Sequence, residues 1–292
     1  MSFRQLLKDT ACRFRAAGIP DPEVDAALLL ARVTGRNPLT LRLDAEQGPT
    51  PDQLAAFEAL CQRRLTREPL QYVLGDQPFL GRSFLVDSRV LIPRPETELL
   101  AERAIADLRR RRGEGLRALD LCCGSGCLAV SMALEMPSVA VDASDLSPDA
   151  LAVTGANAAR LGASVTCLLG DLWDAVGEKR YDVIVSNPPY IPAAACDALQ
   201  PEVLREPRMA LDGGADGLDF YRRIAEGAPR HLRPGGTLLL EVGHDQAGPV
   251  SDLLMAAGLT AVCAHPDLCG IRRMVEGRAG VRPSGTGARA RE

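Results

Sequence analysis

The chain alternates short apolar runs with helical stretches from residue 116 onward, and this pattern constrains its fold more than any other feature. Helical stretches separate the first five runs, which is typical of parallel strands joined by crossover helices on both faces of a sheet. A short loop, 265–271, joins the last two runs, so we predict an antiparallel hairpin at one edge. The predicted strands are 118–121, 139–143, 165–169, 183–185, 237–242, 260–264 and 272–275. We therefore expect an α/β domain with a seven-stranded, doubly wound, mostly parallel sheet.

The first 70 residues have a different pattern and predict a small all-helical domain. Leu6, Leu7 and Phe14 recur at helical spacing, and the segments 21–23 and 50–52 have the polar and proline residues that begin helices. The remaining divisions are a β-hairpin linker over 71–94, the sheet domain over 95–278 and a tail over 279–292. The tail is rich in Gly, Pro, Ser and Arg, so we expect it to be disordered.

Composition excludes several classes of protein. The net charge of −4 does not favour a broad nucleic-acid-binding surface. No apolar run approaches the ~18 residues needed to cross a bilayer, and the first twenty residues lack the apolar stretch of a signal peptide. We therefore expect a cytoplasmic protein.

The nine cysteines are odd in number and scattered, which indicates reduced thiols. The group Cys122, Cys123 and Cys127 lacks the spacing of a metal site.

Three predicted strands end in residues that suit a nucleoside cofactor. Small residues at 122–126 follow the first strand, and they let the free N–H groups of a helix start approach a ligand closely. Asp145 ends the second strand, at the position where doubly wound folds bind ribose hydroxyls. Asp142 is the other candidate for this role. The alternative interpretation of Asp145 is a purely structural one, as a carboxylate at the start of the next helix. Asp171 ends the third strand and is suited to accept from an adenine amino group, with Leu172 or Trp173 against the base. Together these strand ends predict a cofactor that lies across the sheet.

The tetrapeptide Asn187-Pro188-Pro189-Tyr190 follows the fourth predicted strand. Its two prolines hold the chain in an extended shape as it leaves the sheet. The side-chain oxygen of Asn187 and the carbonyl of Pro188 are two acceptors for one planar NH2 group, and Tyr190 supplies an aromatic wall. Such a site suits a substrate with an amide or an exocyclic amine.

With these motifs the chain resembles the S-adenosylmethionine-dependent methyltransferases of Rossmann-like fold, and specifically the peptide chain release factor N5-glutamine methyltransferases. The resemblance covers about residues 1–277, including the segments 93–98, 120–126, 187–190, 206–208 and 234–236. It implies S-adenosyl-L-methionine as cofactor, with the contacts Cys122, Cys123, Gly124, Ser125, Gly126, Asp145, Asp171, Leu172 and Asn187. It also implies that Asn187, Pro188, Pro189 and Tyr190 hold the glutamine amide of the Gly-Gly-Gln motif in class 1 release factors. Family members commonly carry Gly-Thr in place of Cys122-Cys123.

We expect the enzyme to act by positioning its substrate, because an amide nitrogen is a poor nucleophile and must be held in line with the methyl group. No covalent nucleophile is required, and we expect a monomer without a metal. The segments 93–98 and 206–208 have two equally weighted interpretations. They form walls of a substrate cleft, or they make purely structural contacts. A ribosomal protein glutamine, a flipped DNA adenine and a nonenzymatic cofactor-binding role are the competing functions. The acidic charge disfavours DNA, and the segment 93–98 favours release factors.

Overall fold

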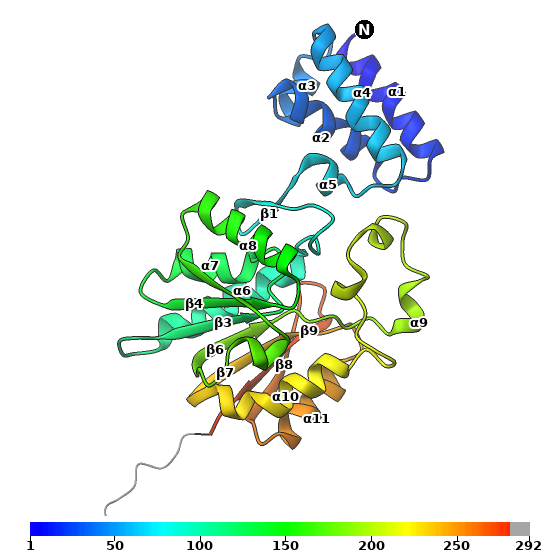
Figure 1. Ribbon diagram of the computed structural model, residues 1–292. Helices are drawn as coiled ribbons and strands as arrows, with labels where there is room; N and C mark the ends of the chain where they lie inside the picture. Colours follow the sequence, from blue (N-terminus) through cyan, green and yellow to red (C-terminus); the bar gives the residue numbers. More distant parts are fainter. Residues whose placement is uncertain (281–292) are drawn as a thin grey trace, which may run out of the picture.

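The structure is a computed structural model that describes residues 1–280, so the tail predicted over 279–292 lies almost entirely outside the described residues. Its main feature is one sheet of seven strands with the order β5-β4-β3-β6-β7-β9-β8 (Figure 1). The strands are β3 (Arg117–Leu121), β4 (Ala140–Asp145), β5 (Val165–Leu169), β6 (Tyr181–Ser186), β7 (Leu232–Glu241), β8 (Thr260–Pro266) and β9 (Arg272–Arg278). β3 to β7 are parallel, whereas β9 runs antiparallel to both of its neighbours. The predicted fold class and its antiparallel edge hairpin are confirmed.

The start of β7 differs from the sequence prediction, which began this strand at Thr237. In the structure Tyr181 pairs with Leu232 and Val183 pairs with Thr237, so residues 233–236 bulge out of the ladder. This segment contains Pro234, which has no N–H to donate, and Gly235, whose φ of 73° suits a residue without a side chain. Because of this bulge, β7 begins at Leu232, before the continuous apolar run that follows Thr237.

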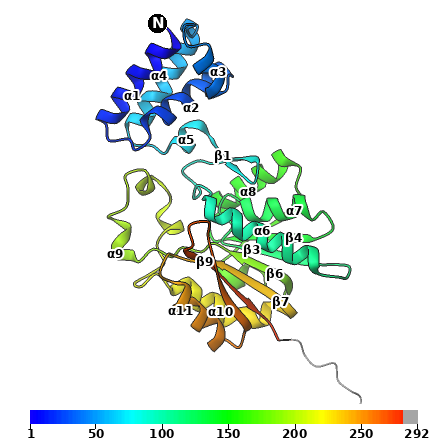
Figure 2. The same ribbon diagram turned by 180° about the vertical axis from the view of Figure 1, so that it is seen from behind.

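Helices cover both faces of the sheet and produce two separate cores. α6 (Pro95–Arg110), α7 (Cys127–Glu135) and α8 (Pro148–Leu161) pack on one face. α10 (Asp219–His231) and α11 (Ala247–Ala256) pack on the other, as the view from behind in Figure 2 shows. All six residues of β6 are buried between these layers, which explains the continuous apolar run 183–185 at its centre.

The N-terminal helices form a separate unit with its own core, to which Phe3, Phe14 and Phe57 contribute. The helices are α1 (Phe3–Ala16), α2 (Pro22–Thr34), α3 (Pro38–Leu43), α4 (Pro51–Leu65) and the short α5 (Leu70–Leu74). Thr50 and Gln53 form a capping box that begins α4, in agreement with the predicted helix start. The short helices α3 and α5 were not predicted. No helix among residues 1–280 has the length and apolar character needed to span a membrane.

A β-hairpin connects the helical unit to the sheet. Its strands are β1 (Asp76–Phe79) and β2 (Arg82–Leu85). The rings of Phe79 and Phe84 meet edge to face, with centroids 5.8 Å apart, and both are buried in the core beneath α6 and α7. The hairpin is therefore anchored on the sheet domain, and Asn157 of α8 holds it further through bonds with both backbone groups of Leu85.

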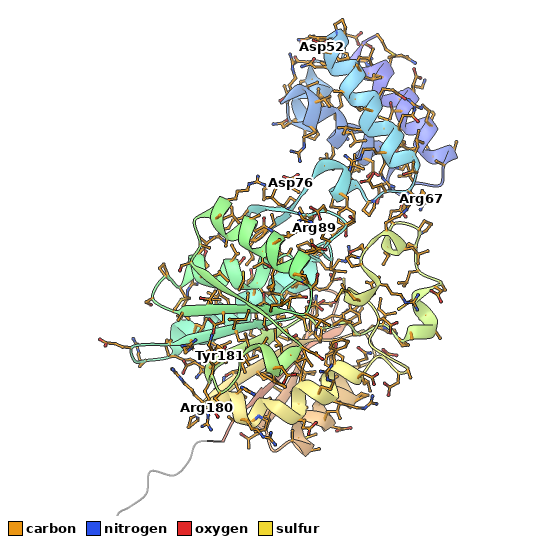
Figure 3. The ribbon with its side chains drawn as sticks, in the orientation of Figure 1. Asp52, Arg67, Asp76, Arg89, Arg180 and Tyr181 are labelled. Atoms are coloured by element: carbon orange, nitrogen blue, oxygen red, sulfur yellow. The ribbon has the colours of Figure 1, made fainter. Side chains whose placement is uncertain are left out.

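A long segment between β6 and α10, which we call the flap (residues 191–218), extends toward the helical unit (Figure 1). It contains α9 (Ala193–Cys196) and the 3-10 turns η2 (Val203–Arg205) and η3 (Arg208–Ala210). The carboxylate of Glu202 accepts from the guanidinium groups of Arg64 and Arg67, at 2.9 and 2.7 Å. Arg67 lies on the side of the helical unit that faces the flap (Figure 3). The flap thus joins the helical unit to the edge of the sheet that contains the candidate site.

Candidate active site

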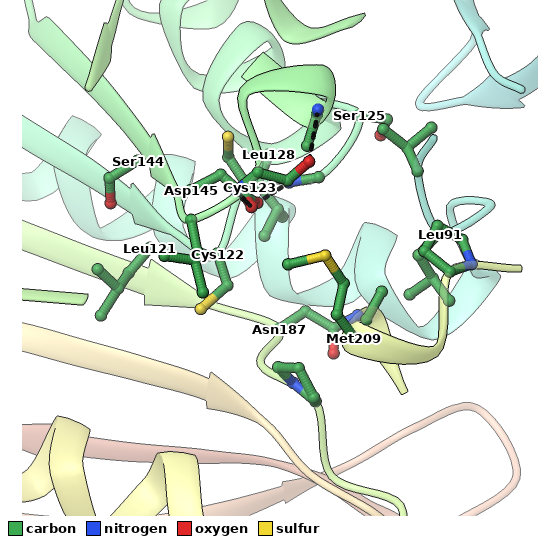
Figure 4. A pocket seen from close by; sticks show the side chains of 18 of the residues that line it. Leu91, Leu121, Cys122, Cys123, Ser125, Leu128, Ser144, Asp145, Asn187 and Met209 are labelled. Atoms are coloured by element: carbon green, nitrogen blue, oxygen red, sulfur yellow. Dashed lines mark hydrogen bonds between the residues drawn. The ribbon is translucent and has the colours of Figure 1, made fainter. Parts of the chain in front are cut away.

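A cavity of about 310 Å³ lies at the carboxyl ends of β3, β4 and β6. The strand order reverses between β3 and β6, and open α/β sheets bind their ligands in the crevice at such a point. The cavity is lined by the loops after these strands, by residues 89–93 of the linker, by Thr97 and by flap residues that include Pro207 and Met209. Figure 4 shows Cys122 and Asp145 on one side of the hollow, Leu91 on the other, and Asn187 and Met209 between them.

The loop after β3 is a tight turn whose backbone faces the cavity. Cys122 and Gly124 have φ values of 64° and 53°, and Gly126 has a φ of 76° at the start of α7. A Cβ atom on Gly126 would lie 2.7 Å from a methyl group of Thr154, so only glycine fits there. Of the five predicted loop residues, the structure brings Cys122, Cys123, Gly124 and Ser125 to the cavity, whereas Gly126 is not among its described lining residues.

The two candidates for the ribose carboxylate occupy different environments. Asp145 lines the cavity and accepts from the backbone N–H groups of Gly124 and Ser147, both at 2.9 Å. Burial raises the pKa of Asp145, and these backbone bonds only partly offset that effect. Asp142 lies farther back in β4, where it accepts from Tyr181 at 2.8 Å and Arg117 at 2.9 Å. Asp142 therefore has a structural role in ion pairing, and Asp145 is the carboxylate that remains at the cavity.

The third strand end contributes Asp171 and Leu172, and both line the cavity. Leu172 begins the 3-10 turn η1 (Leu172–Ala175), and Asp171 pairs with Arg223 of α10 at 2.8 Å. Trp173 points elsewhere: its ring stacks on His231, and its Nε1 donates to the backbone carbonyl of Arg223. Leu172, rather than Trp173, is thus available to pack against a base.

Asn187 lies at the carboxyl end of β6 and lines the cavity together with Pro189. Its Nδ2 lies 3.3 Å from the hydroxyl of Thr97, whereas its Oδ1 is buried and has no hydrogen-bond partner among residues 1–280. A buried acceptor without a partner is costly, which makes it a site where a ligand donor would be stabilising.

Two members of the tetrapeptide, Pro188 and Tyr190, are not among the described residues that line the cavity. Tyr190 packs at the edge of the core beneath α10 and α11, and its backbone carbonyl accepts from Gln246 at 2.9 Å. Burial raises the pKa of Tyr190 to about 12, so its hydroxyl is neutral. The aromatic wall expected from Tyr190 therefore stays a prediction.

The structure assigns contacts to the two segments whose role the sequence left open. Glu206 accepts from the backbone N–H of Ile92 at 3.0 Å and pairs with Arg94, so it fastens the flap to the linker. Arg208 pairs with Asp197 and Asp212 within the flap. Their neighbours Pro207 and Met209 line the cavity, so these segments are both structural clamps and cavity walls.

Leu91 and Met209 line the cavity although the sequence prediction includes neither, whereas Thr97 belongs to the segment 93–98, for which a cleft wall was one of the two alternatives. Thr97 lies inside the segment 93–98, and Met209 directly follows the segment 206–208. Their place in or next to these motifs is the only signal for them in the sequence. Only the folded chain shows that all three residues line the same hollow as Asn187. Figure 4 shows Leu91 and Met209 beside it.

Comparisons with known proteins agree with this architecture. The model of the PrmC N-terminal domain matches residues 5–75, and that of the methyltransferase small domain matches residues 96–217. A release factor glutamine methyltransferase of Geobacter sulfurreducens is 42% identical over 280 residues, which cover 96% of this chain and 97% of that protein. One of Cereibacter sphaeroides is 46% identical over 275 residues, covering 93% and 96% of the two chains. The crystal structure of a methyltransferase from Pyrococcus furiosus has the same fold: TM-score 0.51, 18% identity, 69% of this chain and 91% of that one.

The fold and these matches define an S-adenosyl-L-methionine-dependent methyltransferase. The glycine turn, the strand-end carboxylate and the unpartnered Asn187 acceptor fit such a cofactor and a substrate beside it. More particularly, the chain belongs to the release factor glutamine methyltransferase family.

Proposed function

We propose that this chain transfers the methyl group of S-adenosyl-L-methionine to the side-chain amide nitrogen, N5, of the glutamine in the Gly-Gly-Gln motif of class 1 peptide chain release factors. The observation that carries the proposal is the buried, unpartnered Oδ1 of Asn187 at the cavity. A carbonyl-type oxygen is an acceptor only, so its natural partner is a group with N–H donors, such as a primary amide.

The lining residues support distinct roles toward the cofactor. The N–H groups of Cys123 and Gly124 already donate to Ser144 and Asp145, so the N–H of Ser125, close to the start of α7, is the one that suits the carboxylate of the methionine part. Asp145 has acceptor capacity beyond its two backbone bonds and suits the ribose hydroxyls. Asp171 and Leu172 suit the amino group and the face of adenine. When bound, the cofactor supplies a methyl group made electrophilic by the attached sulfonium.

The chain itself contributes orientation and electrostatic stabilisation. The lone pair of an amide nitrogen is delocalised, so the nitrogen reacts only when it is held in a productive geometry. Acceptance by Asn187 Oδ1 and by the carbonyl of Pro188 would orient the two hydrogens of the substrate amide. Both bonds would strengthen as positive charge develops on the nitrogen during transfer. The proton is released after methyl transfer, and no covalent enzyme intermediate is formed.

Several features favour a release factor over the other substrates. The relatives that match nearly the whole chain are named for release factors, and the N-terminal family model covers the helical unit. The net charge of −4 does not favour a nucleic acid partner. Because release factors act in translation, we propose that the enzyme works in the cytoplasm.

A methyl-transfer assay with labelled S-adenosyl-L-methionine tests the substrate. The panel contains a class 1 release factor, its variant with Ala in place of the Gly-Gly-Gln glutamine, a ribosomal protein and duplex DNA. We expect label only on the unmodified release factor. Label on DNA or on the ribosomal protein alone, or equal label on the variant, would refute the proposal.

A further inference from the structure

A chain of buried polar groups runs behind Asn187 and ends in a carboxylate. The Nδ2 of Asn187 lies 3.3 Å from Thr97 Oγ1, and this hydroxyl lies 2.7 Å from Oε2 of Glu241. Thr97 and Glu241 are both buried, with only 2% and 3% of their surface exposed. The three residues come from the end of β6, the first turn of α6 and the end of β7, so three elements meet at this point.

When Glu241 is ionised, the chemistry of these groups fixes the direction of each hydrogen bond. An ionised carboxylate is an acceptor only, and a hydroxyl has a single proton, so Thr97 donates that proton to Glu241. The oxygen of Thr97 then has only lone pairs to offer, and it accepts from the NH2 end of Asn187. The NH2 end of Asn187 is therefore held at Thr97, and Oδ1 is left without a hydrogen-bond partner among the described residues.

The direction matters because an asparagine amide is nearly symmetrical in shape. Rotation by half a turn would exchange its oxygen for an NH2 group, which repels the N–H donors of a substrate amide. Donation to Thr97 also polarises the Asn187 amide and makes its oxygen a stronger acceptor, as in other hydrogen-bonded chains.

We propose that Thr97 and Glu241 are positioning residues, which hold the Asn187 amide with its oxygen toward the methyl-accepting amide. This inference rests on the proposed function for its consequence in turnover. Neither residue contacts the reacting atoms in this account; both act through Asn187.

Paired substitutions at Thr97 separate positioning from packing. Thr97→Val keeps the shape but removes the hydroxyl, whereas Thr97→Ser keeps the hydroxyl but loses a methyl group. We expect Thr97→Val to lower kcat by about 10- to 100-fold, the range for hydrogen bonds that involve a charged group, with little change in cofactor Kd. Thr97→Ser should restore turnover to within about threefold of the wild type, the scale of a small packing change. Thr10→Val, the same change at a buried threonine of α1, is the matched control and should leave kcat unchanged.

Equal losses in Thr97→Val and Thr97→Ser would overturn the inference, because packing alone would then explain both. A wild-type kcat in Thr97→Val would overturn it as well.

A readout independent of turnover is hydrogen exchange at the side-chain NH2 of Asn187, followed by NMR and assigned with Asn187→Asp. We expect slow exchange in the wild type and fast exchange in Thr97→Val. If the wild type fails to methylate a release factor while this difference persists, the proposed function fails and the positioning stands; equal exchange in both proteins would refute the positioning itself.

Discussion

Cys122 holds a backbone conformation that ordinarily belongs to glycine, with a φ of 64°. A left-handed conformation costs about 1–2 kcal/mol for a residue with a Cβ atom. Burial raises the pKa of the Cys122 thiol, so the side chain adds bulk to the cavity wall without adding charge. The Gly-Thr pair that is common in the family would avoid both the strain and the bulk at this position.

Two substitutions of Cys122 should have different effects on thermal unfolding. Cys122→Gly relieves strain but increases the entropy of the unfolded chain, so we expect a net change within about 1 kcal/mol. Cys122→Val places a β-branched side chain at positive φ and should destabilise by roughly 1–3 kcal/mol. Calorimetric unfolding of both variants measures the difference. A Cys122→Val protein as stable as Cys122→Gly would contradict this view of the turn.

The buried carboxyl of Glu241 predicts a pH dependence of turnover. Burial raises its pKa to about 7, although the bond from Thr97 works in the opposite direction. Protonated Glu241 is able to donate to Thr97, and the hydroxyl proton of Thr97 is then free to turn toward Asn187. Thr97 no longer fixes the NH2 end of the Asn187 amide in that state. We therefore expect kcat to rise as pH increases through about 7. The charged and titratable groups around Glu241 are Arg94, Glu96, Cys127, Tyr190, Tyr221 and Arg273.

Glu241→Gln is the variant that checks this pH dependence. Its side chain does not titrate but still offers an oxygen to Thr97, so kcat in the variant should vary less with pH between about 6 and 8, on either side of the wild-type transition. An unchanged rise of kcat in Glu241→Gln would assign the transition to another group.

At the scale of elements, the flap is fastened to the helical unit mainly through Glu202. Burial works to raise the pKa of this carboxyl, but bonds from Arg67 and Arg64 outweigh it and lower the pKa to about 2. Because the pKa is lowered on folding, the pair stabilises the protein above the ordinary pKa of glutamate. That contribution is lost as pH falls from about 4.5 toward 2, where the folded-state carboxyl is protonated.

Substitution of Glu202 should therefore destabilise the protein more than substitution at an exposed pair of the same flap. We expect Glu202→Ala to lower the free energy of unfolding by about 2 kcal/mol at pH 7, because it leaves Arg64 partly unpaired in a buried position. Asp197→Ala, which removes the exposed partner of Arg208, should cost at most about 0.5 kcal/mol. Denaturant unfolding compares the two, and equal costs would show that Glu202 is not a special anchor.

The elements that local chemistry determines were predictable from the sequence. Strand ends, the start of α4 at Thr50 and the position of Asp145 all follow from neighbours in the chain. The contact between Thr97 and Glu241 joins residues 144 positions apart, and no local pattern specifies it. The packing of Tyr190 against the core beneath α10 and α11 likewise depends on residues far away in the chain.

For the whole molecule, cofactor binding should be visible as added stability. A ligand that binds only the folded state at 100 times its Kd stabilises that state by about 2.7 kcal/mol. Asp145→Ala should weaken S-adenosyl-L-methionine binding by about 10- to 100-fold, so at the same concentration it should gain only about 0.4–1.4 kcal/mol. Asp149→Ala, at an exposed acid four residues later, is the control and should keep the wild-type gain. Thermal unfolding with and without the cofactor measures all three proteins, and a full gain in Asp145→Ala would refute its role.

The most direct test of the central claim is to locate the transferred methyl group by tandem mass spectrometry. A class 1 release factor is incubated with the enzyme and S-adenosyl-L-methionine, then digested and fragmented. We predict the mass of one added methyl group on the side chain of the Gly-Gly-Gln glutamine. The Asn187→Ala enzyme should retain some cofactor affinity but leave that glutamine unmodified. A methyl group on any other residue, or full modification by Asn187→Ala, would contradict the account.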